Sequence, residues 1–276
     1  MHYLNLTEGM VVLFADIIGF KNIVRNSKDV TMNDVGGIII NFDLLNKLFS
    51  QDYSKKVQKQ LNVKLLWISD SIVISTKKRY INNLLKVLVD VIDKLYIMNL
   101  SIRGAICIGK LYHEQNIWGP AYIDVVEMER DVAVYPRIVI NNLDYEQLII
   151  EDAFTPFFEK CETENVMQLN FFAYKLKSIL TSNKNIGIPI CIYIKFILEN
   201  YRSAKKNEHI TKYVWLAEKL SQSILKYNKE IDENLCKNGN AYISYKGKVQ
   251  NIVNHKICIQ LLGEIKLTKG SDEYVI

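Results

Sequence analysis

Apolar residues over the first 140 positions follow two spacings, one typical of buried strands and the other of amphipathic helices. Continuous apolar runs predict five strands, at residues 10–15, 63–68, 72–75, 100–108 and 137–140. Apolar residues at helical spacing predict three helices, at 31–59, 80–98 and 120–134. Ser69-Asp70-Ser71 joins the second and third strands as a hairpin. The order β-α-β-β-α-β-α-β predicts an α/β (α+β) sandwich of the palm-like, ferredoxin-like kind, with antiparallel strands in its sheet.

The pattern changes beyond about residue 180. Residues 166–176 predict a last strand of the sandwich, whereas 190–203 and 208–230 predict two lysine-rich amphipathic helices. Residues 241–276 are rich in strand-forming side chains. We therefore expect an α/β domain at 1–180, a helical extension at 181–238 and a β-prone tail at 239–276.

Amino-acid composition and net charge exclude several classes of protein. Half of the chain is apolar (49%) and it has only 12 Gly and 4 Pro, which excludes a disordered or collagen-like polymer. A net charge of +5 suits a polyanionic ligand such as a nucleotide but is too small for a dedicated nucleic-acid binder. The five widely spaced cysteines predict reduced thiols rather than a disulfide framework or a zinc site. With no signal-peptide pattern and no apolar run long enough to span a bilayer, we expect a cytoplasmic protein without a membrane partner.

Two aspartates stand where predicted strands end. Asp16 follows the run 10–15, and Asp70 lies at the tip of the hairpin. Singly, Asp16 also fits a turn cap or a partner for Lys21, and Asp70 fits a plain hairpin turn. In a β-α-β-β unit, however, the hairpin packs beside the first strand, so the two carboxylates would repel each other unless a cation bridges them. Such oxygen ligands suit Mg²⁺ or Mn²⁺, and two such ions can serve phosphoryl chemistry.

Four segments resemble class III nucleotide cyclases, in the order found in that family. Residues 14–20 (FADIIGF) and 68–71 (ISDS) are similar to its two metal motifs, and 102–105 (IRGA) to the strand whose arginine contacts the triphosphate. Residues 116–120 (NIWGP), with Met128-Glu129, resemble the segment with base-binding and transition-state residues. The resemblance implies two Mn²⁺ or Mg²⁺ ions per site and a head-to-tail homodimer with active sites at its interface. The implied metal ligands are Asp16, Asp70 and the carbonyl of Ile17, and the implied substrate-binding residues are Phe20, Leu66, Arg103 and Asn116.

This chain departs from the purine cyclases at four positions. Leu66 replaces their base-reading lysine and Asn116 their second base-reading residue, usually aspartate, which argues against ATP as substrate. Their transition-state asparagine and arginine fall on Ile123 and Glu127. Residues 118–121, 128–129 and 135–140 most resemble the bacterial pyrimidine cyclases of Pycsar antiphage defence, and 212–216 resemble a further helix of that group. That subgroup makes cyclic UMP or cyclic CMP, which implies UTP or CTP as substrate and a downstream cyclic-nucleotide-binding effector; the resemblance alone favours UTP.

The leading hypothesis is a pyrimidine nucleotide cyclase in which Asp16, Asp70, Arg103 and Arg137 are catalytic. Arg103 also fits an exposed strand arginine. Arg137 could supply the missing transition-state arginine or could pair with Glu127 or Glu129. Two alternatives stay open: a catalytically inactive cyclase-fold dimer that acts as a nucleotide sensor or scaffold, and a palm-type cyclic oligonucleotide synthase.

Overall fold

The computed structural model describes residues 6–20, 32–35, 38–41, 50–114, 116–149, 154–161, 164–239, 241–245 and 248–267. The chain forms two compact units. One comprises Met1–Val35 and Ile39–Asn170, and the other comprises Gly36–Ile38 and Phe171–Ile276. Within the described ranges, none of the helices combines the length and apolar character that a membrane crossing requires.

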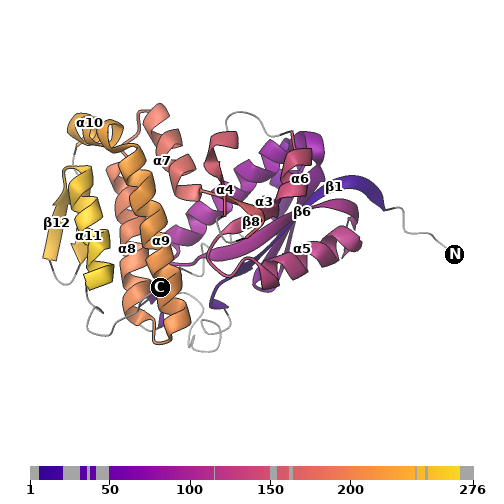
Figure 1. Ribbon diagram of the computed structural model, residues 1–276, viewed down its shortest axis with the longest axis horizontal. Helices are drawn as coiled ribbons and strands as arrows, with labels where there is room; N and C mark the ends of the chain where they lie inside the picture. The colour runs from indigo at the N-terminus through magenta and orange to yellow at the C-terminus, as the bar shows by residue number, and fades with distance from the viewer. Residues whose placement is uncertain are drawn as a thin grey trace. The chain divides into compact units, whose positions relative to one another are not determined.

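The first unit is built on an eight-stranded mixed sheet (Figure 1). Its strands lie in the order β4-β5-β1-β6-β8-β10-β9, with β7 paired to β6. The pair β6–β8 is parallel, and the other pairs are antiparallel. The bounds are β1 (Thr7–Ile17), β4 (Lys64–Ile68), β5 (Ser71–Lys77), β6 (Ile102–His113), β7 (Ile117–Trp118), β8 (Ile138–Asn141), β9 (Phe158–Lys160) and β10 (Val166–Leu169). The predicted α/β sandwich with antiparallel strands is confirmed.

The helices of the first unit match the sequence pattern except near residue 31. They are α3 (Gln51–Leu61), α4 (Ile81–Ile97), α5 (Pro120–Asp131) and α6 (Asn142–Gln147), with 3-10 turns η1 (Lys78–Tyr80) and η2 (Thr155–Phe157). The helices predicted at 80–98 and 120–134 are confirmed as α4 and α5. The helix predicted at 31–59 is wrong in its first part, because β2 (Met32–Val35) and β3 (Ile38–Asn41) form a two-stranded sheet. The β-branched run Ile38-Ile39-Ile40 favours strand over helix, and residues 42–49 lie outside the described part.

One face of β1 is covered by α5. Val12 and Val125 from α5 belong to one buried apolar cluster, and Phe14 packs against it with its ring edge to face on that of Tyr122 at 6.2 Å. Each fully buried side chain of this size contributes about 1.5–3 kcal/mol. Because side chains alternate along a strand, Asp16 projects from this same face, two residues beyond Phe14. The fold therefore places Asp16 at the end of the layer between the sheet and α5.

Gly104 allows β6 to pass close to β1 beside this position. A Cβ atom on Gly104 would lie 2.6 Å from both the Cβ of Ala15 and the carbonyl oxygen of Phe14. We expect Gly104→Ala to lower the free energy of unfolding by about 1–3 kcal/mol, because the strand backbones must move apart. Chemical denaturation measures this change. Gly263→Ala is the control, since nothing lies within 4 Å of its added Cβ; equal stability of the two variants would contradict the prediction.

The second unit is mainly helical, and Figure 1 shows its elements in orange to yellow. They are α7 (Phe171–Thr181), α8 (Gly187–Ser203), α9 (Asn207–Lys226), α10 (Asn228–Asn238), β11 (Ala241–Tyr245), β12 (Lys248–Ile252) and α11 (His255–Leu267). The two predicted helices are confirmed as α8 and α9. The strand predicted at 166–176 ends at Leu169, because α7 begins at Phe171.

The tail differs from its expected strand character in its second half. Its first half forms the hairpin β11–β12, whereas α11 is a helix. Cys258, Leu261, Leu262 and Ile265 are buried at helical spacing, and this burial outweighs the strand-forming composition. The division at residues 180 and 238 stays a prediction.

Candidate active site

Asp16 lies between two strands that each bring a polar side chain to it. In the sheet register its neighbours are Ser71 on β5 and Arg103 on β6. The hydroxyl of Ser71 donates to Oδ1 of Asp16 at 3.3 Å. Burial raises the pKa of Asp16 above its ordinary value, and the nearby Asp70 carboxylate raises it further, while Arg103 and Ser71 act in the opposite sense. The site thus carries negative charge that its own cation and hydroxyl do not fully offset.

Asp70 is held beside the end of β1 by the backbone. The N–H of Ile17 donates to the carbonyl of Asp70 at 2.9 Å, and the N–H of Ile18 donates to the carbonyl of Ser101 at 2.9 Å. Ser69, which precedes Asp70 in the turn, has a left-handed φ of 58°. The first bond fastens the hairpin turn to the end of β1, and the second fastens the end of β1 to the residue before β6. The structure therefore brings Asp16, Ile17 and Asp70 to one end of the sheet.

This arrangement fits divalent cations. Burial, followed by repulsion from the nearby Asp70 carboxylate, raises the pKa of Asp16, and hard oxygen donors are the ligands that Mg²⁺ and Mn²⁺ prefer. Groups of three or more His, Cys, Asp or Glu side chains suited to a metal are absent from the described ranges. The donor set expected here is smaller, two aspartates and one backbone carbonyl, and the residues present fit it.

Arg103 is paired with Glu129, which the sequence analysis considered only within a resembling segment and as a partner of Arg137. Its Nε lies 2.6 Å from Oε1 of Glu129 on α5, and the side chains of Arg103 and Glu129 are 27% and 6% exposed. Burial raises the pKa of Glu129, Arg103 opposes this rise, and the Asp16 carboxylate adds to it. The signal was present in the sequence, because Glu129 continues the buried stripe of Ala121 and Val125 at intervals of four residues. A carboxylate at such a position needs a cationic partner.

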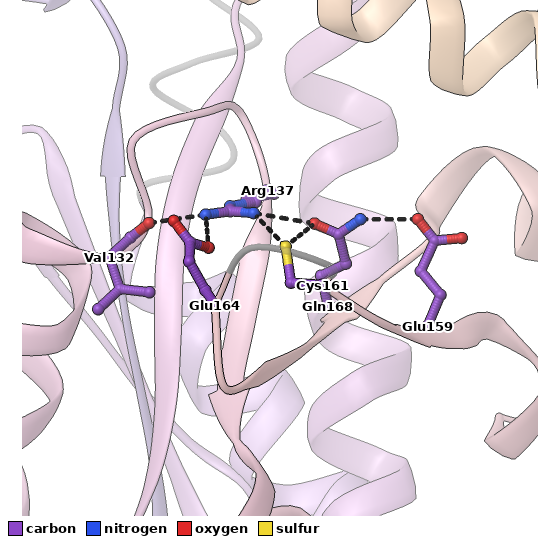
Figure 2. Close-up of polar contacts among 6 residues, drawn as sticks. All are labelled: Val132, Arg137, Glu159, Cys161, Glu164 and Gln168. Atoms are coloured by element: carbon purple, nitrogen blue, oxygen red, sulfur yellow. Dashed lines mark hydrogen bonds and ion pairs between the residues drawn. The ribbon is translucent and has the colours of Figure 1, made fainter.

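Arg137 lies one strand beyond Arg103 in a buried polar network (Figure 2). Its side chain is 3% exposed and forms an ion pair with Glu164. It also donates to the carbonyl oxygen of Val132 at 2.9 Å, to Sγ of Cys161 at 2.8 Å and to Oε1 of Gln168 at 3.2 Å. These partners differ from Glu127 and Glu129, the ones considered from the sequence.

The expected base-contacting residues lie elsewhere on the first unit. Leu66, half-buried on β4, packs against the same apolar cluster as Phe14. Asn116 is exposed in the turn between β6 and β7. Because β6 is 12 residues long, Arg103 at its start and Asn116 beyond its end flank opposite ends of one strand. Phe20, half-buried, follows the turn after Ile17, and Lys21 lies outside the described residues.

The β6–β7 turn that carries Asn116 is supported by a buried histidine. Nδ1 of His113 lies 2.6 Å from the hydroxyl of Ser75. The ammonium of Lys64 donates a hydrogen bond to the carbonyl of His113 and forms an ion pair with Glu114 at 2.6 Å. Burial, together with the charge of Lys64, lowers the pKa of His113 to about 4, although Glu114 opposes the change. The folded protein therefore holds this imidazole neutral.

A pH dependence of stability follows from His113. Its pKa in the folded state, about 4, lies below the ordinary value of 6.5. Stability is therefore fully present above pH 6.5 and falls as the pH drops from 6.5 towards 4, by a contribution on the order of 3 kcal/mol. Denaturation at pH 7.5 and pH 4.5 should show that His113→Gln removes much of this loss. The half-exposed His209 gives the control variant His209→Gln, and equal pH dependence in both variants would refute the assignment.

Comparisons with known proteins find similarity only among solved structures. No family model matches the sequence, and no curated protein matches it. The catalytic core of a rhodopsin-guanylyl cyclase with converted specificity, in complex with ATPalphaS, is 18% identical with a TM-score of 0.39, over 59% of this chain and 95% of that chain. A bacterial light-regulated adenylyl cyclase is 14% identical with a TM-score of 0.40, over 62% of this chain and 54% of that chain. The adenylate/guanylate cyclase/hydrolase from Silicibacter pomeroyi is 14% identical with a TM-score of 0.37, over 59% of this chain and 97% of that chain. Similarity at these values does not assign the chain to a family.

Proposed function

We propose that the protein is a nucleotide cyclase that converts UTP or CTP into the 3′,5′-cyclic mononucleotide and pyrophosphate. The observation that carries this proposal is the meeting of Asp16 and Asp70 at one sheet end, beside Arg103. These residues come from three of the segments that resemble class III cyclases. Two carboxylates beside one arginine are the groups that such chemistry needs.

Each group has a separate task in this proposal. Asp16, Asp70 and the carbonyl of Ile17 would hold two Mn²⁺ or Mg²⁺ ions, which would supply positive charge near the attacking 3′-hydroxyl and the departing phosphate. The guanidinium of Arg103 binds oxygens of the triphosphate. The 3′-oxygen forms a bond to the α-phosphorus, the bond from that phosphorus to the oxygen bridging to the β-phosphorus breaks, pyrophosphate leaves with that oxygen, and the hydroxyl proton passes to solvent water.

The departures at the base-contacting positions argue against ATP, and the pyrimidine assignment itself rests on the resemblance to the Pycsar cyclases. Leu66 offers an apolar surface and Asn116 an amide where purine cyclases have a lysine and usually an aspartate. Asn116 and Arg103 flank opposite ends of β6, which supports a head-to-tail homodimer in which one subunit contacts the base and its partner the phosphates. The Pycsar resemblance supports a second-messenger role in antiphage defence, with a cyclic-nucleotide-binding effector downstream.

A mixture of all four nucleoside triphosphates with Mn²⁺ tests the proposal. Mass spectrometry should find cyclic UMP or cyclic CMP, together with released pyrophosphate, and no product when EDTA is present. Linked nucleotides would instead show a cyclic oligonucleotide synthase. Production of cyclic AMP alone would refute the pyrimidine assignment.

A catalytically inactive nucleotide sensor is the second candidate. Ile123 and Glu127 are exposed on α5 at the positions where the resembling family has its transition-state residues. Neither side chain supplies positive charge. The retained pair Asp16 and Asp70 argues for catalysis, because a sensor gains nothing from a repulsive pair. Calorimetric binding of a triphosphate without any product from the mixture would favour the sensor.

A further inference from the structure

Arg103 lies on β6, Arg137 immediately precedes the neighbouring parallel strand β8, and the two are joined through the backbone. The N–H of Gly104, next to Arg103, donates to the carbonyl of Arg137 at 2.9 Å. The register pairs Gly104 with Ile138, so the two arginines belong to one row of the sheet. Arg103 is within reach of the predicted metal ligands, whereas Arg137 is buried among protein groups. The two side chains therefore have different surroundings although their backbones are adjacent.

The guanidinium of Arg137 also binds the C-terminal end of α5. It donates to the carbonyl oxygen of Val132, the C-cap residue of α5, at 2.9 Å. The last carbonyl groups of a helix have no partner within the helix, and a cation there interacts favourably with the helix dipole. The N–H of Val132 in turn donates to the carbonyl of Met128 at 3.0 Å, the residue before Glu129. Arg137 thus fixes the turn of α5 that carries Glu129.

The other contacts of Arg137 anchor it to the sheet edge (Figure 2). Glu164, 33% exposed at its side chain, pairs with the guanidinium from the turn between β9 and β10. Gln168 on β10 accepts from it and donates to Oε1 of Glu159 on β9 at 2.7 Å. A planar guanidinium bound on several sides cannot rotate without breaking several bonds. The hydrogen bonds of Arg137 therefore connect the C-terminal end of α5 to strands β9 and β10.

We propose that Arg137 is a positioning residue for Arg103, acting through the end of α5 and Glu129. Glu129 contacts Nε of Arg103, one of the five guanidinium N–H donors, and this contact sets how the terminal nitrogens face the proposed triphosphate. If the end of α5 shifts, Glu129 shifts and Arg103 loses its orientation. A displacement of about 1 Å in a positioning group can cost on the order of a hundred-fold in rate. This inference rests on the proposed function, which makes Arg103 the phosphate ligand.

We call the contacts of Arg137 with Val132, Glu164 and Gln168 the Arg137 clamp. Two variants disturb this clamp without changing a residue of the proposed site. Arg137→Lys keeps the charge but loses the planar fork, and Glu164→Gln weakens the anchor while Arg137 stays in place. For each we expect kcat/KM for the triphosphate to fall about ten-fold, with calorimetric affinity for a non-hydrolysable triphosphate falling in parallel. The matched control is Arg130→Lys, since Arg130 is exposed at the same end of α5 and pairs with Asp131 at 2.7 Å. It should change neither quantity by more than about two-fold.

A double-mutant cycle separates positioning from general destabilisation. In an Arg103→Lys background, Arg137→Lys and Glu164→Gln should cause less than about a two-fold further loss, because the group that they orient is already changed. Losses that multiply with that of Arg103→Lys would overturn the inference. Should Arg137→Lys fail to fold, Glu164→Gln alone completes the cycle.

The two proposals fail in distinguishable ways. If the wild-type protein forms product but the losses of the Arg137 or Glu164 variant and of Arg103→Lys multiply, the positioning role of Arg137 is overturned. The proposed cyclase function is then unaffected. If no product forms but the losses of triphosphate affinity in the double-mutant cycle do not multiply, the proposed cyclase function is overturned. The positioning role of Arg137 is then supported. Absence of any triphosphate binding by the wild-type protein would overturn both.

Discussion

Asp16→Asn is expected to reduce cyclic-nucleotide formation by at least about a thousand-fold, because it removes a carboxylate that we propose as a ligand of the catalytic cations. Metal ions contribute several kcal/mol of charge stabilisation in such reactions, and about 4 kcal/mol corresponds to a factor of a thousand. Turnover with saturating Mn²⁺, followed as pyrophosphate release, measures the change. Asp70→Asn should show a loss of similar size.

The same substitution should raise the stability of the metal-free protein. The pKa of Asp16 is raised in the folded state, so its charged form opposes folding at neutral pH. Below about pH 3.8, the ordinary value, the carboxyl is protonated in both states and the penalty disappears. The stability gain of Asp16→Asn in EDTA should therefore be present at pH 7 and vanish in acid.

Two results would contradict this account of Asp16. Full activity of Asp16→Asn with metal present would remove Asp16 from the metal site, and a fall in metal-free stability at pH 7 would show that the carboxylate is structurally paired. Asp52→Asn is the control, because Asp52 is exposed in the first turn of α3. It should leave activity unchanged.

Arg137→Met is expected to lower the free energy of unfolding by about 3 kcal/mol. Removing one partner of a buried ion pair costs about 3–5 kcal/mol, and the lower end applies here because Glu164 is one-third exposed and can be hydrated. The carbonyl of Val132 and Oε1 of Gln168 would also lose a donor. Chemical denaturation of the purified variant measures the change.

Arg130→Met serves as the matched control for Arg137→Met. Arg130 is an exposed arginine whose partner, Asp131, is also exposed, so its loss should cost less than about 1 kcal/mol. If the two methionine variants were equally stable, the buried network would contribute nothing. The contacts of Arg137 with Glu164 and the end of α5 would then not stabilise the folded protein.

The hairpin and the first strand could be predicted from local pattern, because apolar runs and a short turn are signals carried by neighbouring residues. The segment at 31–59 could not, since Ile38-Ile39-Ile40 fits the apolar spacing of a helix and the β preference of a strand. Helix α11 was missed for a related reason. Its apolar residues are also strand formers, and their burial at helical spacing decides the structure.

The candidate site divides in the same way. Asp16, Asp70 and Arg103 were found from their positions at strand ends and from motif resemblance. The pairing of Glu129 with Arg103 was missed, because it depends on where α5 crosses β6. The partners of Arg137 were missed too, since Glu164 and Gln168 belong to a hairpin that joins the sheet beside β8.

By itself, the sequence determined which segments become strands and helices in most of the chain, and which carboxylates stand at strand ends. These properties depend on side-chain spacing over a few residues. Only the tertiary structure decided which charges meet: Arg103 with Glu129, and Arg137 with Glu164 and the end of α5. A buried charge must take whichever opposite charge or hydrogen-bond partner the packed elements bring within reach, and that choice is made between residues distant in the chain.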